Sequence, residues 1–327
     1  MEYIFLPLTS FDNIKLCDEY KDWLEKWLYE LNENIEKEII SSSECVQGFI
    51  AEKILNKNDI DWQEVEKNYL RDEKNMPMSY SKEYGKRLFK FESQWKQMPV
   101  HAVYNSFWLS KQYGLDTYVY AEIIREFIQS SGWIYNPEVS NTQLRTRMRS
   151  ELMMSMAMGV EILSEKGLEE LEKNRIEAAL ASVSLTGYIS AEYFRTLVLE
   201  KIERIYQIPE GIETMLKSCE AGEGFSDFSL ADKVDDYMGT QKRTKYDNVI
   251  HTPLISSMAN YLGKLNEDVN SYLKIRMKKY AEFLAENPMN IPSFKMRDID
   301  YPFGTGITAL EILAAASIVT KYILEGV

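Results

Sequence analysis

Residues 14–40 read IKLCDEYKDWLEKWLYELNENIEKEII and carry the clearest periodic pattern in the chain. Large apolar side chains recur there at steps of three and four residues, with lysines and glutamates between them. This spacing places the apolar side chains along one side of an α-helix, which turns once in about 3.6 residues. They are Leu16, Tyr20, Trp23, Leu24, Trp27, Leu28, Leu31 and Ile35. The pattern predicts a long amphipathic helix with this stripe buried.

Similar helical patterns follow along most of the chain, separated by glycines, prolines and short polar runs. We expect helices over 45–55, 60–70, 80–95, 100–113, 115–131, 140–164, 168–185, 190–206 and 254–285, and a last one from about 308. Strand signals are few and short. The sequence therefore predicts an all-α fold with little or no sheet. The roughly ten to thirteen helices would form a multi-helix bundle or an irregular array of helical hairpins.

Several residues predict where these helices begin and end. Asn58 and Asp59 are expected to cap the helix that follows them, because their side-chain oxygens can accept the first helical N–H groups. Gly114 and Gly167 are expected to end helices, because glycine readily adopts the left-handed conformation found after a last helical turn.

The length of 327 residues fits one large domain or two smaller ones, each with a sizeable core. We expect a single helical domain over 1–327. The polar connection at 72–78 offers the alternative division, an N-terminal helical subdomain over 1–75 and a main helical domain over 76–327.

Charge and cysteine content limit the classes of partner and compartment. The chain has 38 lysines and arginines against 51 aspartates and glutamates, a net charge of -13, so nucleic acid is not an expected partner. Three scattered cysteines and the lack of a signal-peptide pattern predict a cytoplasmic protein with an acidic surface, typical of a bacterial-type protein. The apolar run at 307–319 is too short to span a bilayer, so we expect a buried helix there and no membrane association.

Aromatic and methionine side chains crowd two of the predicted helical regions. The aromatic residues are Tyr104, Phe107, Trp108, Tyr113, Tyr118 and Tyr120, and the methionines lie in the run LMMSMAM at 152–158. Such residues at helical spacing form core more often than they line a ligand pocket. We therefore expect both groups to be buried in the core.

Reactive side chains gather in residues 219–253, CEAGEGFSDFSLADKVDDYMGTQKRTKYDNVIHTP, where the helical pattern pauses. Asp232, Asp235 and Asp236 stand at i, i+3 and i+4 of a short predicted helix and point in nearly one direction. Three such carboxylates fit a Mg²⁺ ion that bridges to a phosphorylated ligand, because Mg²⁺ prefers oxygen ligands. The competing interpretation is a solvated acidic face that complements the helix dipole.

The same region holds the candidates for proton transfer and two of the five candidates for anion binding. The candidate catalytic groups are His251, Glu223 and Asp227, of which the histidine precedes a predicted helix start and can act as a base there. The candidate anion-binding residues are Arg145, Arg149, Lys242, Arg243 and Arg297. Arg145 and Arg149 share one face of a predicted helix, where acids such as Glu151 would satisfy them equally well.

Two classes of function fit these features. No complete hydrolase or metalloprotease motif occurs, and two histidines with three scattered cysteines argue against structural zinc. We expect a cytoplasmic, all-helical interaction or regulatory protein of the inhibitor, immunity or assembly-subunit type, which binds a protein partner or a second copy through its acidic surface. The alternative is a helical enzyme for a small anionic or phosphorylated substrate, with Mg²⁺ at the three aspartates as its cofactor.

Overall fold

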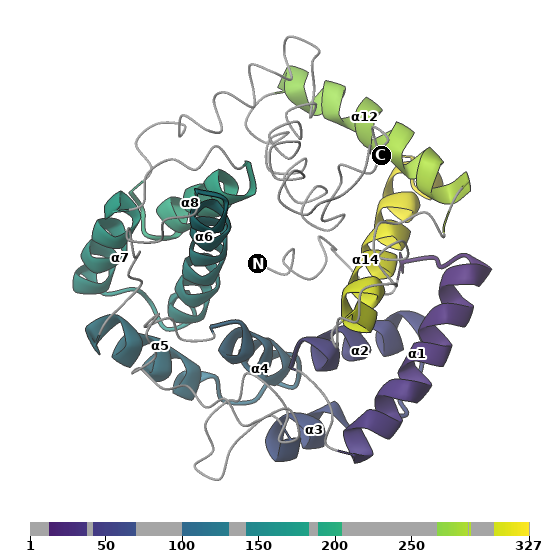
Figure 1. Ribbon diagram of the computed structural model, residues 1–327, viewed down its shortest axis with the longest axis horizontal. Coiled ribbons are helices and arrows are strands. Elements are labelled where there is room, and N and C mark those ends of the chain that lie inside the picture. The colour runs from purple at the N-terminus through teal and green to yellow at the C-terminus, as the bar shows by residue number, and fades with distance from the viewer. Residues whose placement is uncertain are drawn as a thin grey trace. The chain divides into compact units, whose positions relative to one another are not determined.

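A computed structural model of the chain describes residues 13–37, 42–69, 100–130, 142–182, 189–204, 267–286, 288 and 304–326. Within these ranges the protein consists of ten α-helices and one short π-helical turn, with no strand (Figure 1). The predicted all-α fold of roughly ten helices is therefore confirmed.

The helices mostly follow the predicted boundaries to within a few residues. The first five are α1 (Asp18–Glu36), α2 (Ser42–Leu55), α3 (Trp62–Tyr69), α4 (Val100–Gln112) and α5 (Tyr118–Ser130). The others are α6 (Thr142–Ser164), α7 (Glu170–Ser182), α8 (Ile189–Lys201), α12 (Glu267–Glu286), α14 (Gly304–Val319) and the π-helical turn η5 (Thr320–Leu324). The helix predicted over 80–95 lies outside the described residues.

The helices are grouped into two compact units. Unit 1 contains α1 as far as Glu33, α2 from Gln47 with the turn up to Ile60, and α12, α14 and η5. Unit 2 contains α3 to α8 together with the end of α1 and the start of α2. The predicted domain organisation, one domain or a division between 75 and 76, stays a prediction.

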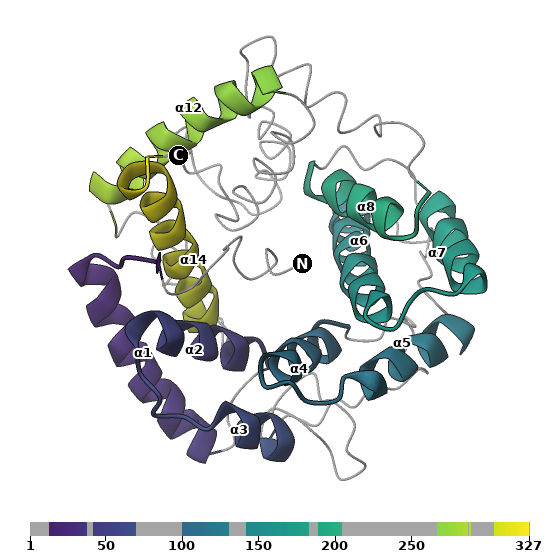
Figure 2. The same ribbon diagram turned by 180° about the vertical axis from the view of Figure 1, so that it is seen from behind.

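The apolar core of unit 1 includes a helix that is enclosed on all sides. Every residue of α14 from Ile312 to Ile318 is buried, which requires neighbours around the whole helix. α12 packs against it (Figures 1 and 2). The buried residues Met277, Ala281 and Leu284 of α12 recur at steps of four and three, as expected for one buried stripe. The buried helix predicted over 307–319 is thus present.

The turn after α2 is held by a buried carboxylate. Asn56 adopts a left-handed φ of 54°, and the N–H of Lys57 donates to the carbonyl oxygen of Glu52 at 2.9 Å, which closes the helix. The side chain of Glu52, also buried, accepts the N–H groups of Asp59 and Ile60 at 3.0 and 3.1 Å. One residue therefore ends α2 through its backbone and orders the next turn through its side chain.

This arrangement corrects the predicted capping of α3. Asp61 caps the helix, because its Oδ1 accepts the N–H of Glu64 at 3.0 Å. The assignment of Asn58 and Asp59 as caps was wrong. Because Glu52 draws the N–H of Asp59 into the preceding turn, the first helical turn of α3 begins later in the chain.

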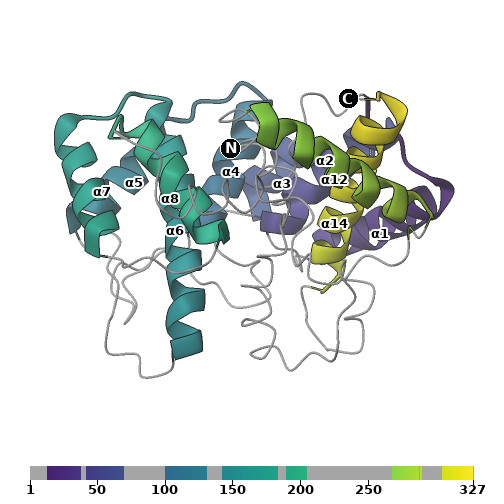
Figure 3. The ribbon, with the colours of Figure 1, turned by 90° about the horizontal axis from the view of Figure 1, so that it is seen from above.

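Unit 2 is built around α4, in which all residues from 103 to 110 are buried. α4 packs against α3, α5 and α6, α6 packs against α8, and α5 packs against α7 (Figure 3). Four aromatic residues confirm the core prediction: Tyr104, Phe107, Trp108 and Tyr120. The methionine prediction is confirmed for Met153, Met156 and Met158, which are buried in α6.

Candidate functional site

Most of the predicted site residues lie outside the described residues. They are His251, Glu223, Asp227, Asp232, Asp235, Asp236, Lys242, Arg243 and Arg297. Arg145 and Arg149 lie in the first turns of α6, four residues apart as predicted. The structure describes their backbone but not their side chains. Within the described ranges no group of three or more His, Cys, Asp or Glu side chains is placed to hold a metal ion. The metal, catalytic and anion assignments stay predictions.

Two turns of unit 2 lie side by side, the one between α4 and α5 and the one between α6 and α7. Lys111 Nζ pairs with Glu165 Oε1 across them at 2.8 Å. Lys166 Nζ lies 5.6 Å from the centroid of the Tyr118 ring. We call the two segments together the paired-turn surface, residues 113–119 and 165–171.

Arg125 of α5 fastens the two turns to each other. Its Nε donates to Glu172 Oε1 at 2.8 Å, its Nη1 pairs with Glu122 Oε1 at 2.8 Å, and its Nη2 donates to the carbonyl oxygen of Gly167 at 3.3 Å. The second oxygen of Glu172 accepts the N–H of Glu169 at 2.8 Å, which is the reciprocal half of a capping box at the start of α7. One buried carboxylate thus caps α7 and holds α5.

Glycines close both turns, as predicted. Gly114 has a φ of 65° and Gly167 a φ of 84°, values that strain residues with a β-carbon. After α4, the N–H of Gly114 donates to the carbonyl oxygen of Lys111 at 3.1 Å, and the N–H of Leu115 donates to that of Ser110 at 3.0 Å. This pair of bonds is a Schellman ending, and it turns the chain sharply toward α5.

Large apolar side chains are concentrated on the paired-turn surface. It carries five of the eight that are exposed within the described ranges, namely Tyr113, Leu115, Tyr118, Val119 and Leu171. The other three, Tyr29, Ile275 and Leu324, belong to three different elements. Single exposed apolar residues are ordinary, whereas several gathered within one polar-rimmed region mark an interaction site.

The core prediction was therefore wrong for Tyr113 and Tyr118. Both follow the helical periodicity in sequence, but Tyr113 lies in the turn just before Gly114 and Tyr118 is the first residue of α5. Their side chains are exposed because the turn, and not the packed middle of a helix, sets their surroundings.

The paired-turn surface is acidic. Within its two segments Asp116, Glu165, Glu169 and Glu170 stand against Lys166 alone, and all five are exposed. Just beyond it, the hydrogen bond from Arg125 lowers the pKa of the Glu122 carboxyl. The neighbouring Glu122 raises the pKa of the Tyr118 phenol. Both shifts favour an ionised Glu122 beside a neutral Tyr118 phenol at neutral pH.

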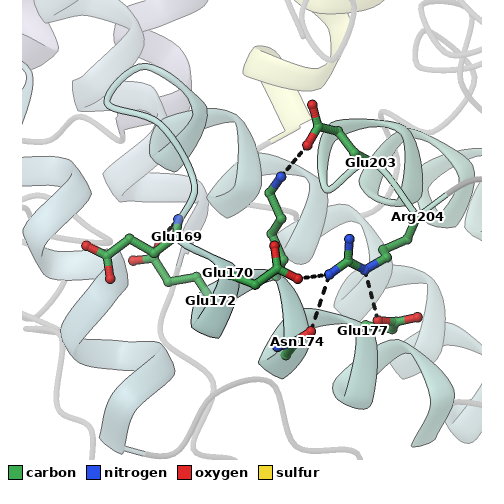
Figure 4. A network of polar contacts seen from close by, with 8 residues as sticks. Glu169, Glu170, Glu172, Asn174, Glu177, Glu203 and Arg204 are labelled. Carbon is green, nitrogen blue, oxygen red and sulfur yellow. Dashed lines mark hydrogen bonds and ion pairs between the residues drawn. The ribbon is translucent and has the colours of Figure 1, made fainter.

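Arg204, just after α8, contacts α7 at the edge of this surface (Figure 4). Its Nε lies 3.3 Å from Glu177 Oε2, and its Nη2 lies 3.3 Å from Asn174 Oδ1 and also pairs with Glu170. These three acceptors stand at i, i+4 and i+7, so they form one stripe along α7. The arginine therefore offsets the negative charge of the two carboxylates in this stripe.

The end of α8 is held in place by further contacts with α7. Glu203 has a left-handed φ of 58° and forms an ion pair with Lys173, which lowers the pKa of the Glu203 carboxyl. Arg195 Nη1 donates to the carbonyl oxygen of Leu180 at 2.9 Å, near the C-terminal end of α7. α7 is therefore supported along its length by cations from α8.

A buried polar chain lies beneath the α4–α5 turn. Tyr120 Oη donates to Glu66 Oε1 at 2.9 Å and lies 2.8 Å from Ser110 Oγ. Because the tyrosine proton is directed at Glu66, the serine hydroxyl is the donor to the tyrosine oxygen. All three residues are buried, and the chain of hydrogen bonds joins α3, α4 and α5.

The Cys45 side chain is also buried. Its burial, together with the carboxylates of Glu44 and Glu66, raises the pKa of the Cys45 thiol well above its ordinary value.

Comparison with known proteins adds no family to these observations. No protein-family model matches the chain, and no curated protein or solved structure matches it either. In the part of the chain that the structure describes, no helix is both long and apolar enough to cross a membrane.

Sequence reasoning did not single out Arg125, Glu172 or Glu66. A usable signal existed for Glu172, which stands three residues after Glu169 and shortly after a helix-ending glycine, the spacing of a capping box. The partners of Arg125 and Glu66 are about 50 residues away, at separations of 47 and 54, and left no local pattern.

Proposed function

We propose that this protein is an all-helical interaction protein that binds a protein partner through the paired-turn surface. The observation that carries the proposal comes from the described part of the chain: of the eight large apolar side chains exposed there, five lie on these two turns. Apolar anchors at the centre of an interface supply most of its binding free energy. The contacts of Arg125 with Glu172 and Gly167 hold the two turns, and so these apolar side chains, in a fixed arrangement. This lowers the entropy cost of binding.

The charge of the surface favours a basic partner. The two segments hold four acidic residues and one lysine; Lys111 pairs with Glu165 and Arg204 with Glu170, and the whole chain carries a net charge of -13. Complementary charge speeds association and selects against partners of the same sign. A second copy of this chain fits less well, because a twofold contact would bring the same acidic segments together. A cytoplasmic partner is part of this proposal, in line with the scattered cysteines.

A matched pair of substitutions tests the proposal. Leu171 of the surface and Ile275 of α12 are both 59% exposed, so Leu171→Ser and Ile275→Ser remove similar apolar area from different places. We expect cross-linking and affinity purification from native lysate to recover a common partner with the wild type and with Ile275→Ser. Leu171→Ser should reduce recovery at least several-fold, and adding Leu115→Ser should reduce it further. Equal recovery with all three proteins would overturn the proposal.

A further inference from the structure

Tyr118 differs from the other exposed residues of the paired-turn surface because its ring already contacts a cation. The side chain is 49% exposed at the start of α5, and Lys166 Nζ from the other turn lies 5.6 Å from the ring centroid. A lysine or arginine within about 6 Å of an aromatic face is attracted by the negative face of the ring. The structure thus contains an internal example of a cation at this position.

Carboxylates around Tyr118 strengthen this attraction. Asp116 Oδ1 accepts the N–H of Tyr118 at 2.9 Å, and it offsets the positive end of the α5 dipole. Glu122, one turn further along α5, raises the pKa of the Tyr118 phenol and also pairs with Arg125. Asp116 therefore lies at the backbone of Tyr118 and Glu122 acts on its phenol, and the negative charge of both favours a cation at the ring.

Lys166 is only weakly held at this position. Among the described residues no ion pair of Lys166 is found, and the adjacent Glu165 pairs with Lys111. Its side chain is exposed, so water and rotamer entropy compete with the ring contact. A cation that arrives with other anchoring contacts can therefore replace it.

We propose that the Tyr118 ring, with Asp116 and Glu122, is a cation subsite of the paired-turn surface, and that an arginine or lysine of the partner takes the place of Lys166. The inference rests on the proposed function and names the partner's chemistry. The partner presents a basic side chain beside apolar ones, because Leu115 and Val119 are exposed in the same turn. The internal lysine competes with the partner and lowers its affinity.

The test uses two defined probes with the full chain. One is a fluorescein-labelled amphipathic peptide with leucines at helical spacing and a central arginine, and the other carries uncharged citrulline in its place. Fluorescence anisotropy would compare the wild type, Lys166→Ala, Tyr118→Phe and Tyr118→Leu. Lys21→Ala, which removes an exposed lysine of α1, serves as the control for net charge.

We expect Lys166→Ala to bind the arginine peptide about two- to fivefold more tightly than the wild type, with a smaller change for the citrulline peptide. Tyr118→Phe should keep the preference for arginine, because the ring remains, and Tyr118→Leu should reduce it. Equal shifts in Lys166→Ala and Lys21→Ala would overturn the subsite, as would an arginine preference unchanged in Tyr118→Leu. Failure of both peptides to bind Lys166→Ala would also overturn it.

The same peptides separate this inference from the proposed function. Leu171→Ser should weaken both peptides if the surface is a docking site. If it does so while the Lys166 and Tyr118 variants leave the preference unchanged, only the cation subsite fails. If Leu171→Ser leaves both affinities unchanged, the proposed function fails as well.

Discussion

The carboxylate of Glu172 binds Arg125 Nε at 2.8 Å with one oxygen and caps the first turn of α7 with the other. Both side chains are largely buried, at 18% and 9% exposure. This pair therefore links the start of one helix to the side of another and sets the spacing of the two turns. Removing one partner leaves a buried charge unpaired, which lowers the free energy of unfolding, so substitutions in this pair should have measurable effects on stability.

Replacing Arg125 should destabilise the protein more than replacing its exposed partner. Arg125→Ala leaves Glu172 without its arginine, and we expect a loss of about 2 to 3 kcal/mol in the free energy of unfolding, measured by urea denaturation. Glu122→Gln removes only the exposed ion pair and should cost at most about 0.5 kcal/mol. Equal effects of the two substitutions would contradict this account of the clamp.

The buried polar chain predicts a second stability difference. Tyr120→Phe removes the donor to Glu66 and the acceptor of Ser110, and we expect a loss of about 1 to 3 kcal/mol in the free energy of unfolding. Tyr29→Phe makes the same chemical change at an exposed position of α1 and should lie within about 0.5 kcal/mol of the wild type. If the two variants denature alike, the hydrogen bonds of Tyr120 do not stabilise unit 2.

At Gly114 there is room for a side chain, but the backbone conformation is unfavourable for any residue other than glycine. A β-carbon there would meet no atom within 4 Å, while the φ of 65° is strained for alanine. We expect Gly114→Ala to lower the free energy of unfolding by about 1 kcal/mol and Gly114→Asn to lower it less, because asparagine enters the left-handed region more readily. Thermal or urea denaturation would show the order, and a reversed order would rule out backbone strain as the cause.

Acid should remove the contribution of the Lys173–Glu203 pair. The lysine lowers the pKa of Glu203 in the folded protein below its ordinary value of 4.5. A lowered folded pKa means that the stabilisation is fully present above the unfolded pKa and is lost as the pH falls through the folded pKa. The urea midpoints of the wild type and Glu203→Gln should therefore differ at neutral pH and converge in acid. A difference that is independent of pH would refute this assignment.

The two described cysteines should react differently. Cys17 is exposed and Cys45 is buried, and burial raises the pKa of the Cys45 thiol well above its ordinary value. In a Cys219→Ser background, alkylation followed by mass spectrometry should modify Cys17 in the native protein and Cys45 only after unfolding, because the thiolate is the reactive form. Native labelling of Cys45 at the rate of Cys17 would show that this part of unit 2 opens readily.

The helices were predictable because their signals are local. The apolar stripe of α1, the buried run of α14 and the glycines after α4 and α6 all act through residues within a few positions of one another. The wrong caps of α3 are also local in origin, since Asp59 and Asp61 lie two residues apart and the contact of Glu52 with the N–H of Asp59 leaves the cap to Asp61. The predicted catalytic and metal residues between 219 and 306 lie outside the described residues, so that part of the site stays a prediction.

The amino-acid sequence by itself determined the all-α class, the positions of most helices and their glycine-ended turns, because backbone hydrogen bonds in a helix join residues four apart. Only the tertiary structure decided that the α4–α5 turn lies beside the α6–α7 turn, that Glu172 is the partner of Arg125, and that Tyr118 is exposed while Tyr120 is buried. These outcomes depend on how the helices pack, which joins side chains far apart in the chain and leaves no periodic trace in it.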